Sequence, residues 1–451
     1  MVTHRRSRNS QMTTLGVWTN GQRVGTWSVE DGDHTFQYHP TWAGSPAARQ
    51  LSLSLPFTPA NIPHRGDRVR YFFDNLLPDS DAIRRRLGDK FAAGSTDTFD
   101  LLAAIGRECV GAVQLLPIGT EPDGFDRIES TPLDDAGVEQ IINNAVTPGR
   151  VLGQDHEDDF RISIAGAQEK TALLWRNGRW QRPLGATPTT HIFKLPLGLV
   201  GHMRADMHTS VENEWLCAQI LATLGLPMAQ CEVASFGQRK VLIVERFDRA
   251  LQSRADGTQW LARLPQEDFC QALGIAGDRK YESDGGPGIR AILRQLDTSR
   301  LADDDKLTFI KAQLIFWVMA ATDGHAKNFS IFLERGGGFR LTPLYDVLSA
   351  WPIIGNGPNQ ISPRRAKLAM ALRSKNTHYH LHEIHTRHWQ ALALQSGVPD
   401  AFDHMVALVL MVPDALDRVR ALLPPGFPPR VFSAIRAGMI AQAERFVAEL
   451  A

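Results

Sequence analysis

The chain has 451 residues, a length typical of about three domains or of one large two-lobed enzyme. It carries 49 Lys and Arg against 49 Asp and Glu, so its formal net charge is zero. This balance excludes a wholly basic nucleic-acid-binding protein, and any polyanion would have to meet a local patch. Hydrophobic residues make up 43% and charged residues 22%, which is a globular composition and not a disordered one.

The four cysteines lie far apart and form no CxxC pair, which argues against a zinc ribbon or a disulfide framework. No apolar run approaches the roughly 20 residues of a membrane span. The basic start, MVTHRRSRNSQMTT, leads into no apolar stretch and is not typical of a secretory signal. We therefore expect a cytoplasmic protein with no membrane partner and with a disordered basic tail over residues 1–13.

Residues 14–57 alternate β-like runs with the turn signals NG at 20–21 and DGD at 31–33. The runs LGVWT, RVGTWSV, HTFQYH and LSLSLPF predict an antiparallel meander. Residues 68–105 have a helical pattern. The segment from about 118 to 158 is polar and ends in the acidic run DHEDD, where we place a domain boundary.

After this boundary the β-like runs return as FRISI, KTALLW, HIFKL and VLIVERF, and one helix interrupts them. That helix, over residues 211–225, places Leu216, Ile220 and Leu224 on one stripe. From about 266 the pattern becomes mostly helical, and residues 306–321 are apolar enough for a largely buried helix. A loop, a strand, a glycine turn and a second strand follow, and the last hundred residues are again predicted to be helical.

The most informative stretch runs from Thr322 to Asp346. Asp323 and Asn328 lie in the loop that leaves the buried helix, and Asp346 follows at the far end of the predicted hairpin. Phosphoryl transfer from ATP needs one aspartate to accept the proton of the substrate hydroxyl, and an asparagine and a second aspartate to hold Mg²⁺. The D-x-x-x-x-N spacing equals that of the protein-kinase catalytic loop. Such residues are also common in ordinary loops, so the placement after a buried helix favours the functional interpretation.

A kinase also needs a cation on the phosphates. Lys194 lies in the β-like run HIFKLP, where a lysine is unfavourable unless it is paired. A glutamate on the next helix, Glu212 or preferably Glu214, is the natural partner, and a half-exposed strand face is the alternative. His325 and Lys327 either reach phosphate oxygens or are simply solvated.

Residues 163–171, SIAGAQEKT, lack the Walker glycines, because positions 164 and 169 are Ile164 and Glu169. A small-residue loop between two strands can still bring backbone N–H groups to a phosphate. The segment VERFDR, 244–249, ends an apolar strand at the place where a kinase-like fold puts its hinge against adenine.

Two further features have a functional and a plain interpretation. Residues 376–389 hold five histidines, but no H-E-x-x-H motif or nearby cysteine, so metal binding is the weaker interpretation. Residues 347–382 contain no Asp or Glu and carry a local basic patch. This patch is fit for a phosphate backbone, although a solvated face is the simpler explanation.

With these motifs in place, the chain resembles the HipA family, the serine/threonine-kinase toxins of bacterial toxin–antitoxin modules, from about residue 14 to residue 445. The resemblance depends on eight long blocks of sequence: YFFDNLLPDS (71–80), DFRISIAGAQEKTALL (159–174), PTTHIFKLP (188–196), VERFDR (244–249), RLPQEDFCQ (263–271), KYESDGGPGI (280–289), ATDGHAKNFSIF (321–332) and LTPLYDVLSAWP (341–352).

The resemblance implies an α+β, two-lobed protein-kinase-like fold with a β-rich N-terminal part and a mostly helical C-terminal lobe. We expect an N-terminal β-rich subdomain over residues 14–155. The remainder of the kinase N-lobe with the ATP loop would span residues 156–265, and the helical C-lobe with the catalytic loop would span residues 266–451.

The resemblance also implies a kinase site that uses ATP and Mg²⁺. Asp323 would be the catalytic base, Asn328 and Asp346 the metal ligands, and Ser163 the autophosphorylated serine whose modification shuts the kinase off. The expected ATP-binding residues are Ala165, Gly166, Ala167, Gln168, Glu169, Lys170, Lys194, Glu245, Arg246, Phe247, His325, Ala326, Lys327, Asn328, Tyr345 and Asp346.

The partners that the resemblance implies are an aminoacyl-tRNA synthetase, typically the glutamyl enzyme, as target and a small helix-turn-helix antitoxin as neutralising subunit. Toxin and antitoxin would bind operator DNA together, with Arg373 and Lys375 as the DNA-contact candidates, although residues 373–388 diverge from the family's pattern. Two rivals stay open: a small-molecule phosphotransferase, which uses similar loops, and a non-catalytic DNA-binding corepressor.

Overall fold

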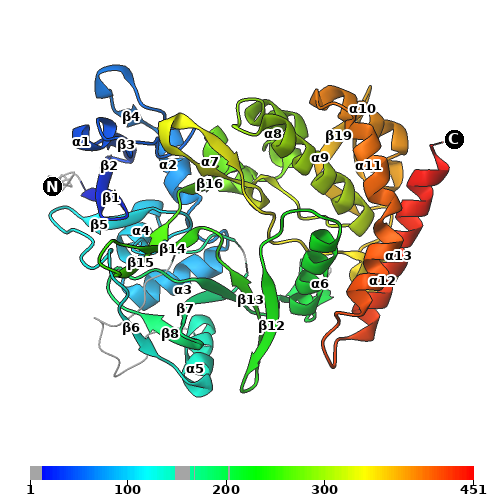
Figure 1. Ribbon diagram of the computed structural model, residues 1–451, viewed down its shortest axis with the longest axis horizontal. Coiled ribbons are helices and arrows are strands. Elements are labelled where there is room, and N and C mark those ends of the chain that lie inside the picture. The colour runs from blue at the N-terminus through cyan, green and yellow to red at the C-terminus, as the bar shows by residue number, and fades with distance from the viewer. Residues whose placement is uncertain (1–12, 148–162, 167, 202–203, 451) are drawn as a thin grey trace, which may run out of the picture.

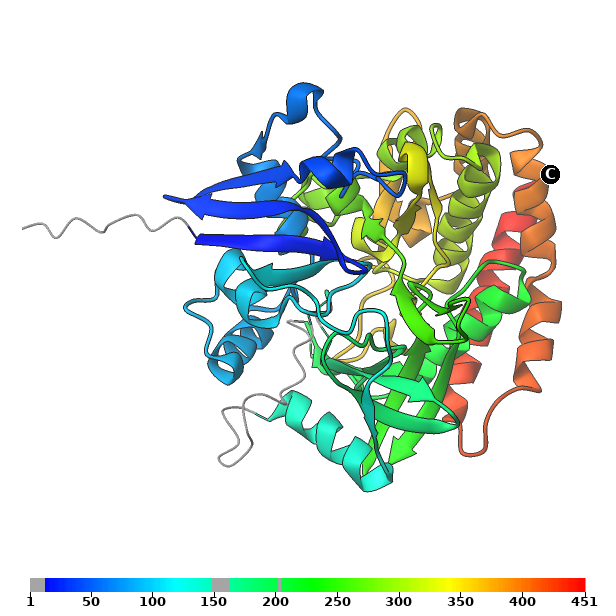
Figure 2. The ribbon, with the colours of Figure 1, turned by 60° about the vertical axis from the view of Figure 1, so that its left-hand side comes forward.

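The computed structural model describes residues 13–147, 163–166, 168–201 and 204–450. The tail predicted before the first strand and most of the run FRISI lie outside these residues. The N-terminal strands lie at one end of the molecule and the C-terminal helices at the other, with a second sheet between them (Figures 1 and 2).

The N-terminal part is an antiparallel sheet in the order β4-β3-β2-β1-β5. The first three strands form the predicted meander, because the turns at 20–21 and 31–32 contain Asn, Asp and Gly at positive φ. Trp27, fully buried, stacks on Phe73 with ring centroids 3.9 Å apart. The elements are β1 (Thr13–Thr19), β2 (Gln22–Glu30), β3 (Asp33–Tyr38), α1 (Pro40–Ala43), β4 (His64–Arg65), α2 (Asp67–Asp74), α3 (Asp81–Phe91), α4 (Thr98–Ile105) and β5 (Gln114–Pro117).

The run LSLSLPF, predicted to be a further strand of the meander, forms turns that an isolated bridge between Ser52 and Leu55 closes. The serines bond outside any ladder: the Ser54 hydroxyl donates to the carbonyl oxygen of Gln271 at 2.7 Å. Leu55 is fully buried. The strand prediction is wrong because serine side chains offer the backbone a local alternative to a strand ladder.

A second sheet has the order β12-β13-β9-β7-β8-β6, with helices on both faces. Side chains alternate across it, so Val241 and Ile243 pack on α5 while Leu242, between them, joins the core around α6. The elements are β6 (Ser130–Pro132), α5 (Asp135–Val146), β7 (Lys170–Arg176), β8 (Arg179–Pro183), β9 (His191–Lys194), α6 (Ser210–Thr223), β12 (Cys231–Phe236) and β13 (Arg239–Glu245), with the hairpins β10 (Gly198–Val200)–β11 (Ala205–Met207) and β14 (Arg249–Ser253)–β15 (Gln259–Arg263).

The predicted division near residue 155 does not coincide with the division of the cores. Strand β6 pairs with β8, and Val138 and Ile142 of α5 share a core with Phe193 of β9. The segment from residue 130 therefore packs with the second sheet. Residues 118–129, most of them exposed, form the connection from β5 to this segment.

The C-terminal lobe is built around α9, which contributes twelve buried residues and ends, as predicted, just before the aspartate loop. The loop leads directly into β17, the central strand of the short sheet β16-β17-β18. The elements are β16 (Gln266–Asp268), α7 (Phe269–Leu273), α8 (Ile289–Leu296), α9 (Ala302–Met319), β17 (Ser330–Leu333), β18 (Phe339–Leu341), β19 (Lys367–Arg373), β20 (Thr377–His380), α10 (Thr386–Ser396), α11 (Ala401–Leu410), α12 (Val412–Arg420) and α13 (Pro429–Ala448).

The hairpin β19–β20 corrects the prediction that the last hundred residues are helical throughout. Its buried strand KLAMALR reads as a short apolar run that periodicity alone cannot assign to helix or strand.

A buried ionic cluster joins the N-terminal part to the second sheet. The Glu108 carboxylate accepts from Arg263 at 2.6 Å and from Arg249 at 3.0 Å, and lies 3.2 Å from Arg246. Asp248 adds a second carboxylate, 2.9 Å from Arg246. All five side chains are at most 4% exposed. Removing one partner would leave a buried charge unpaired, which is costly. The cluster therefore favours this one arrangement of the N-terminal part on the second sheet.

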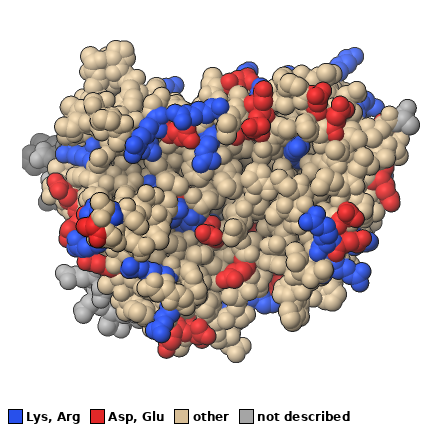
Figure 3. Space-filling view, in the orientation of Figure 1, with Lys and Arg blue, Asp and Glu red and all other residues tan. Residues whose placement is uncertain are grey.

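Positive and negative side chains are interspersed over the face seen in Figure 3, in keeping with the balanced composition. Among the described helices, none is both long and apolar enough to cross a membrane.

Glu267 of β16 is a buried carboxyl without a cation partner. It accepts from the backbone N–H of Leu53 at 2.8 Å, while its Oε2 has no hydrogen-bond partner and the side chain is fully buried. Burial raises its pKa to about 8. The carboxyl is therefore neutral in the folded chain at pH values where the unfolded chain has it ionised.

This difference predicts a pH-dependent stability. The folded state binds the proton more tightly, so the free energy of unfolding falls as pH rises from about 4.5 to about 8, by at most about 1.4 kcal/mol per pH unit from this group. Glu267→Gln should keep the bond to Leu53 and flatten the decline, as measured by urea denaturation from pH 5 to pH 8. Glu121→Gln, at an exposed carboxylate, is the control. Parallel curves for Glu267→Gln and wild type would contradict the assignment.

Candidate active site

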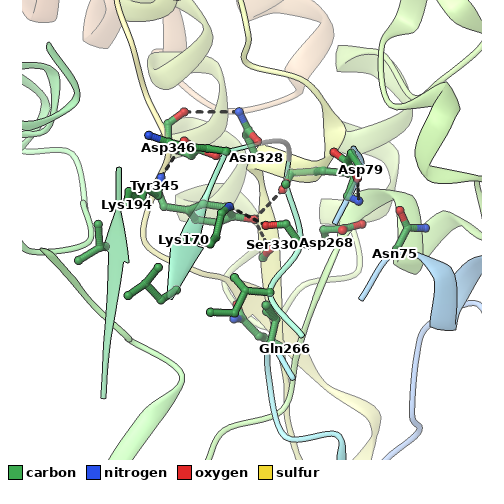
Figure 4. Close-up of a pocket in the computed structure, with 18 of the residues that line it drawn as sticks. Asn75, Asp79, Lys170, Lys194, Gln266, Asp268, Asn328, Ser330, Tyr345 and Asp346 are labelled. Atoms are coloured by element: carbon green, nitrogen blue, oxygen red, sulfur yellow. Dashed lines mark hydrogen bonds and ion pairs between the residues drawn. The ribbon is translucent and has the colours of Figure 1, made fainter. Parts of the chain in front are cut away.

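An open cleft lies between the second sheet and the C-terminal lobe, and residues of the N-terminal part close one side (Figure 4). Asn75 and Asp79 come from the N-terminal part, and Lys170 and Lys194 from the sheet. The C-terminal lobe contributes the aspartate loop and Asp346.

Lys194 lies at the centre of the cleft and is 8% exposed. Its Nζ donates to Glu214 at 2.6 Å and to Asp346 at 2.8 Å. The pairing follows from the sheet's alternation: Phe193 faces α5, so the next side chain faces α6, which carries Glu214. Glu212, the other candidate, instead pairs with Lys240 at 2.6 Å.

The two carboxylates that share this lysine differ in pKa. Burial raises the pKa of Glu214 to about 7. Burial also acts on Asp346, but the positive charge of Lys194 outweighs it and holds the pKa of this carboxyl well below its usual range. Asp346 is therefore an anion at neutral pH, and its side chain is 30% exposed toward the cleft. Its φ of 60° places it in the left-handed region, which aspartate tolerates better than most residues.

The aspartate loop begins where α9 ends, with Ala320 at φ 51° closing the helix. Asn328 ties the loop together, because its Nδ2 donates to the backbone oxygen of Asp323 at 2.8 Å and to that of Asp346 at 3.4 Å. Both bonds use the NH₂ group, which leaves the Asn328 Oδ1 for another partner.

These oxygens suit the Mg²⁺ that the predictions require. An amide oxygen and an ionised carboxylate from two adjoining loops are hard ligands of the kind that Mg²⁺ uses together with substrate phosphates. Mg²⁺ usually takes one or two ligands from the protein, and water and phosphate oxygens complete its coordination shell. The described residues contain no cluster of three or more His, Cys, Asp or Glu that could hold a metal without such help.

The loop before β7 approaches the same cleft. Ala165, Gly166, Gln168 and Lys170 line it, whereas Ala167 lies outside the described residues. Gly166 has φ 110°, a conformation that strongly favours glycine. The Lys170 Nζ donates to the carbonyl oxygen of Ala165 at 2.7 Å, and burial beside Lys194 lowers its pKa to about 8.

Ser163 begins this loop and is fully buried. Its hydroxyl donates to the carbonyl oxygen of Leu76 at 2.7 Å, and its N–H donates to the Glu108 carbonyl oxygen at 2.8 Å. The loop is thus fastened to the N-terminal part at its first residue.

Glu245, Arg246 and Phe247 line the cleft at the end of β13. Strand β13 is fixed here by backbone bonds, including one from Arg246 N–H to the Thr190 oxygen at 2.8 Å. The Arg246 side chain turns into the ionic cluster, and its carbonyl oxygen accepts from the Arg249 N–H at 3.3 Å, so this residue is held in place at the edge of the cleft. Phe247 packs 5.8 Å from the ring of Tyr345, which also lines the cleft.

Besides Arg246, two of the predicted ATP-binding residues do not turn their side chains into the cleft. Glu169 pairs with Arg86 of α3 and lines a separate hollow behind the loop. Ala326 is fully buried beneath the aspartate loop. Any contribution of these two residues to a nucleotide would come from the backbone.

His325 and Lys327 both line the cleft. Lys327 is not solvated: its Nζ pairs with Asp79 at 2.6 Å, and Lys280 pairs with the other oxygen of Asp79 at 2.8 Å. These two lysines outweigh the effect of burial and lower the pKa of Asp79 well below its usual range. The nearby Asp268 has no such pair, and burial raises its pKa to about 6.

Asp79, Lys280 and Asp268 are cleft residues that the sequence analysis left without a role. Each lies inside a block that resembles the family, so the signal was present, but no spacing rule connects residues 79, 280 and 327. Only the folded chain shows that they share one charge cluster.

The DNA-contact candidates lie on the hairpin β19–β20. Arg373 is not free, because it pairs with Glu282 at 2.5 Å, while Lys375 is exposed in the turn. The histidine stretch forms no metal site among the described residues: His378 stacks on His388 at 4.1 Å, and His385 bonds to Glu449 at 2.8 Å.

Comparisons with known proteins agree with this geometry. The profile of the HipA N-terminal domain matches residues 15–116, and that of the HipA-like C-terminal domain matches residues 162–416. Y4mE of Sinorhizobium fredii, named as a candidate kinase, is 34% identical over 85% of this chain and 86% of its own. The serine/threonine-protein kinase toxin HipA of Shewanella oneidensis is 25% identical over 91% and 90%.

A solved complex of HipA, HipB and operator DNA from Shewanella oneidensis contains a similar chain, with a TM-score of 0.76 at 23% identity over 96% of this chain and 97% of that one. The fold and the cleft define a two-lobed, protein-kinase-like protein. More narrowly, the chain belongs to the HipA family.

The pairing of Lys194 predicts that removal of this side chain lowers the affinity for nucleotide. If the cleft binds Mg²⁺–ATP as the sequence predicts, Lys194→Ala should weaken this binding at least tenfold, because it removes a cation from the cleft and leaves Asp346 and Glu214 facing each other. Isothermal titration calorimetry would measure the affinity, with Lys240→Ala, at the more exposed Lys240–Glu212 pair, as the matched control. Equal affinities for wild type and Lys194→Ala would contradict a phosphate contact.

Proposed function

We propose that this protein is an ATP- and Mg²⁺-dependent serine/threonine protein kinase that acts as a growth-arrest toxin. The observation that supports this most directly is the convergence of Lys194, Glu214 and Asp346 with Asp323 and Asn328 in one cleft. These five residues come from four segments of the chain, and each matches one part that phosphoryl transfer requires.

In this proposal each residue has one task. Asp323 accepts the proton of the attacking hydroxyl, and its exposed side chain is accessible to a protein substrate. Lys194 holds the phosphates, and Glu214 fixes the lysine. Asn328 and Asp346 would hold Mg²⁺, which supplies charge neutralisation at the phosphates when bound. Catalysis is then mainly positioning and electrostatic stabilisation.

The partners follow from the family and from the solved relative. A helix-turn-helix antitoxin of the HipB kind would neutralise the toxin and bind operator DNA with it, since the relative was solved as such a complex. Lys375 is accessible for a DNA contact, whereas Arg373 would first have to leave Glu282. The proposed target is an aminoacyl-tRNA synthetase, in the first place the glutamyl enzyme.

Asp323→Asn should abolish phosphate transfer and keep the fold, because the amide cannot accept the proton. Purified protein would be incubated with Mg²⁺–ATP and glutamyl-tRNA synthetase, and phosphosites mapped by mass spectrometry. Synthetase phosphate from wild type alone supports the proposal. Phosphate only on the kinase itself would mean that the target is a different protein. Appreciable transfer by Asp323→Asn would refute the assignment of Asp323 as the base.

If neither protein is phosphorylated, and Ser163 is shown to be free of phosphate beforehand, the kinase proposal fails. Phosphorylation of a metabolite in the same assay would then favour a small-molecule phosphotransferase. Operator binding with the antitoxin and no transfer at all would favour a non-catalytic corepressor.

Ser163 is the proposed switch of this kinase. Its hydroxyl is fully buried and donates to the Leu76 carbonyl oxygen, and a phosphate with a charge of about −1.5 to −2 would break this bond and either repel the phosphates of ATP or pair with a local arginine. The loop from Ser163 to Lys170 would therefore have to leave the cleft once it is modified.

Stoichiometric phosphorylation of Ser163 should lower affinity for Mg²⁺–ATP at least tenfold, and phosphatase treatment should restore it. Calorimetric titration checks both steps. Ser163→Ala, which cannot be modified, serves as the control and should bind nucleotide before and after incubation with ATP. Undiminished binding by the phosphorylated protein would refute the switch.

A further inference from the structure

The proposed catalytic base already has a hydroxyl bound to it. The phenol O–H of Tyr281 donates to Asp323 Oδ1 in a short hydrogen bond. This donor is of the same chemical kind as a serine or threonine side chain, and it uses the same carboxylate that an acceptor hydroxyl needs. Tyr281 thus occupies the acceptor position of the site.

The tyrosine is held in place from several sides. Its ring meets His325 edge-on, with centroids 5.0 Å apart and planes at 88°. The preceding residue, Lys280, pairs with Asp79 at 2.8 Å, and its carbonyl accepts from the backbone N–H of Ala326 at 3.3 Å. The contact between the phenol and Asp323 is therefore part of a fixed arrangement.

The following residue is fixed as well. Glu282 accepts from the backbone N–H of Ala371 at 2.7 Å and pairs with Arg373, so the hairpin β19–β20 anchors this end of the segment. The turn that completes the segment is tight: a Cβ on Gly286 would lie 1.9 Å from the carbonyl oxygen of Arg279. The backbone on both sides of Tyr281 is thus anchored, and the phenol side chain is the part of this segment that meets the base.

Burial and the negative charge of Asp323 raise the pKa of Tyr281 above its ordinary value. The phenol therefore keeps its proton throughout the physiological range and acts only as a donor. It competes with water and with protein hydroxyls for the base without itself being activated.

We propose that Tyr281 is an acceptor gate: it holds the acceptor position on Asp323 until a protein substrate displaces it, and so suppresses transfer to water and to poorly docked hydroxyls. This inference rests on the proposed kinase function. Tyr281 is a positioning residue here, because it acts on the reaction through the base and not on the phosphates.

The test compares Tyr281→Phe with wild type in two assays. Without the phenol hydroxyl, hydrolysis of [γ-³²P]ATP to phosphate should rise about five- to tenfold, since a hydrogen bond to a charged group no longer has to be broken before water reaches Asp323. With glutamyl-tRNA synthetase as acceptor, KM should fall while kcat changes less than twofold. Tyr71→Phe, which removes a phenol hydroxyl on α2 outside the cleft, should match wild type in both.

Unchanged ATP hydrolysis and unchanged KM in folded Tyr281→Phe would overturn the gate, and so would a fall in kcat, which would make Tyr281 an aid to the base. If Tyr281→Phe fails to fold by circular dichroism, Tyr281→Leu is measured by the same criteria. Failure of the kinase proposal is distinct, because wild type would then show no transfer that depends on Asp323.

Discussion

The arrangement of the cleft depends on one physical constraint: a lysine ammonium group removed from water must be surrounded by anions. Lys194 is 8% exposed and satisfies this constraint with Glu214 from α6 and Asp346 from the C-terminal lobe. Each of these contacts joins different parts of the chain, so a single charge fixes the second sheet, its helix and the far lobe relative to one another. A buried charge of this kind is costly unless paired, which makes incorrect arrangements of the two lobes unfavourable.

The same principle recurs at two further places in the cleft. Asp79 brings Lys280 and Lys327 together, and it does so from the N-terminal part. Glu108 does the same for three arginines at the end of β13 and in the hairpin β14–β15. The walls of the cleft are thus held by ionic clusters whose members are scattered over the sequence. An apolar core that runs from α6 and β13 into the C-terminal lobe joins the same parts.

Features that depend on near neighbours in the sequence could be predicted, and features that depend on distant residues could not. Local patterns were enough for the meander at the N-terminus, for α6 and α9, and for the loop with Asp323 and Asn328, because each depends on neighbours within a few residues. A glutamate on the helix after Lys194 could be expected from the strand alone, but only the structure shows that Glu214 pairs with this lysine while Glu212 pairs with Lys240. LSLSLPF failed because the Ser52 hydroxyl accepts from the Ser54 N–H and so replaces a strand partner, which the pattern of apolar residues does not reveal. The roles of Asp79, Lys280 and Tyr281 could not be predicted, since no periodicity connects residues so distant in the chain.

The buried cluster at Glu108 has a consequence for how the chain can be divided. The same residue offers its backbone oxygen to Ser163 and its carboxylate to the arginines behind the hinge. A chain that began after β5 would retain Arg246, Arg249 and Arg263 with Asp248 as the one carboxylate of the cluster, and the loop that begins at Ser163 would lose its bond to Glu108. The two segments that match separate domain profiles are therefore halves of one folding unit. Insertions or fusions are compatible with this architecture at its surface connections, but not an exchange of one half for that of another protein unless the counter-charges come with it.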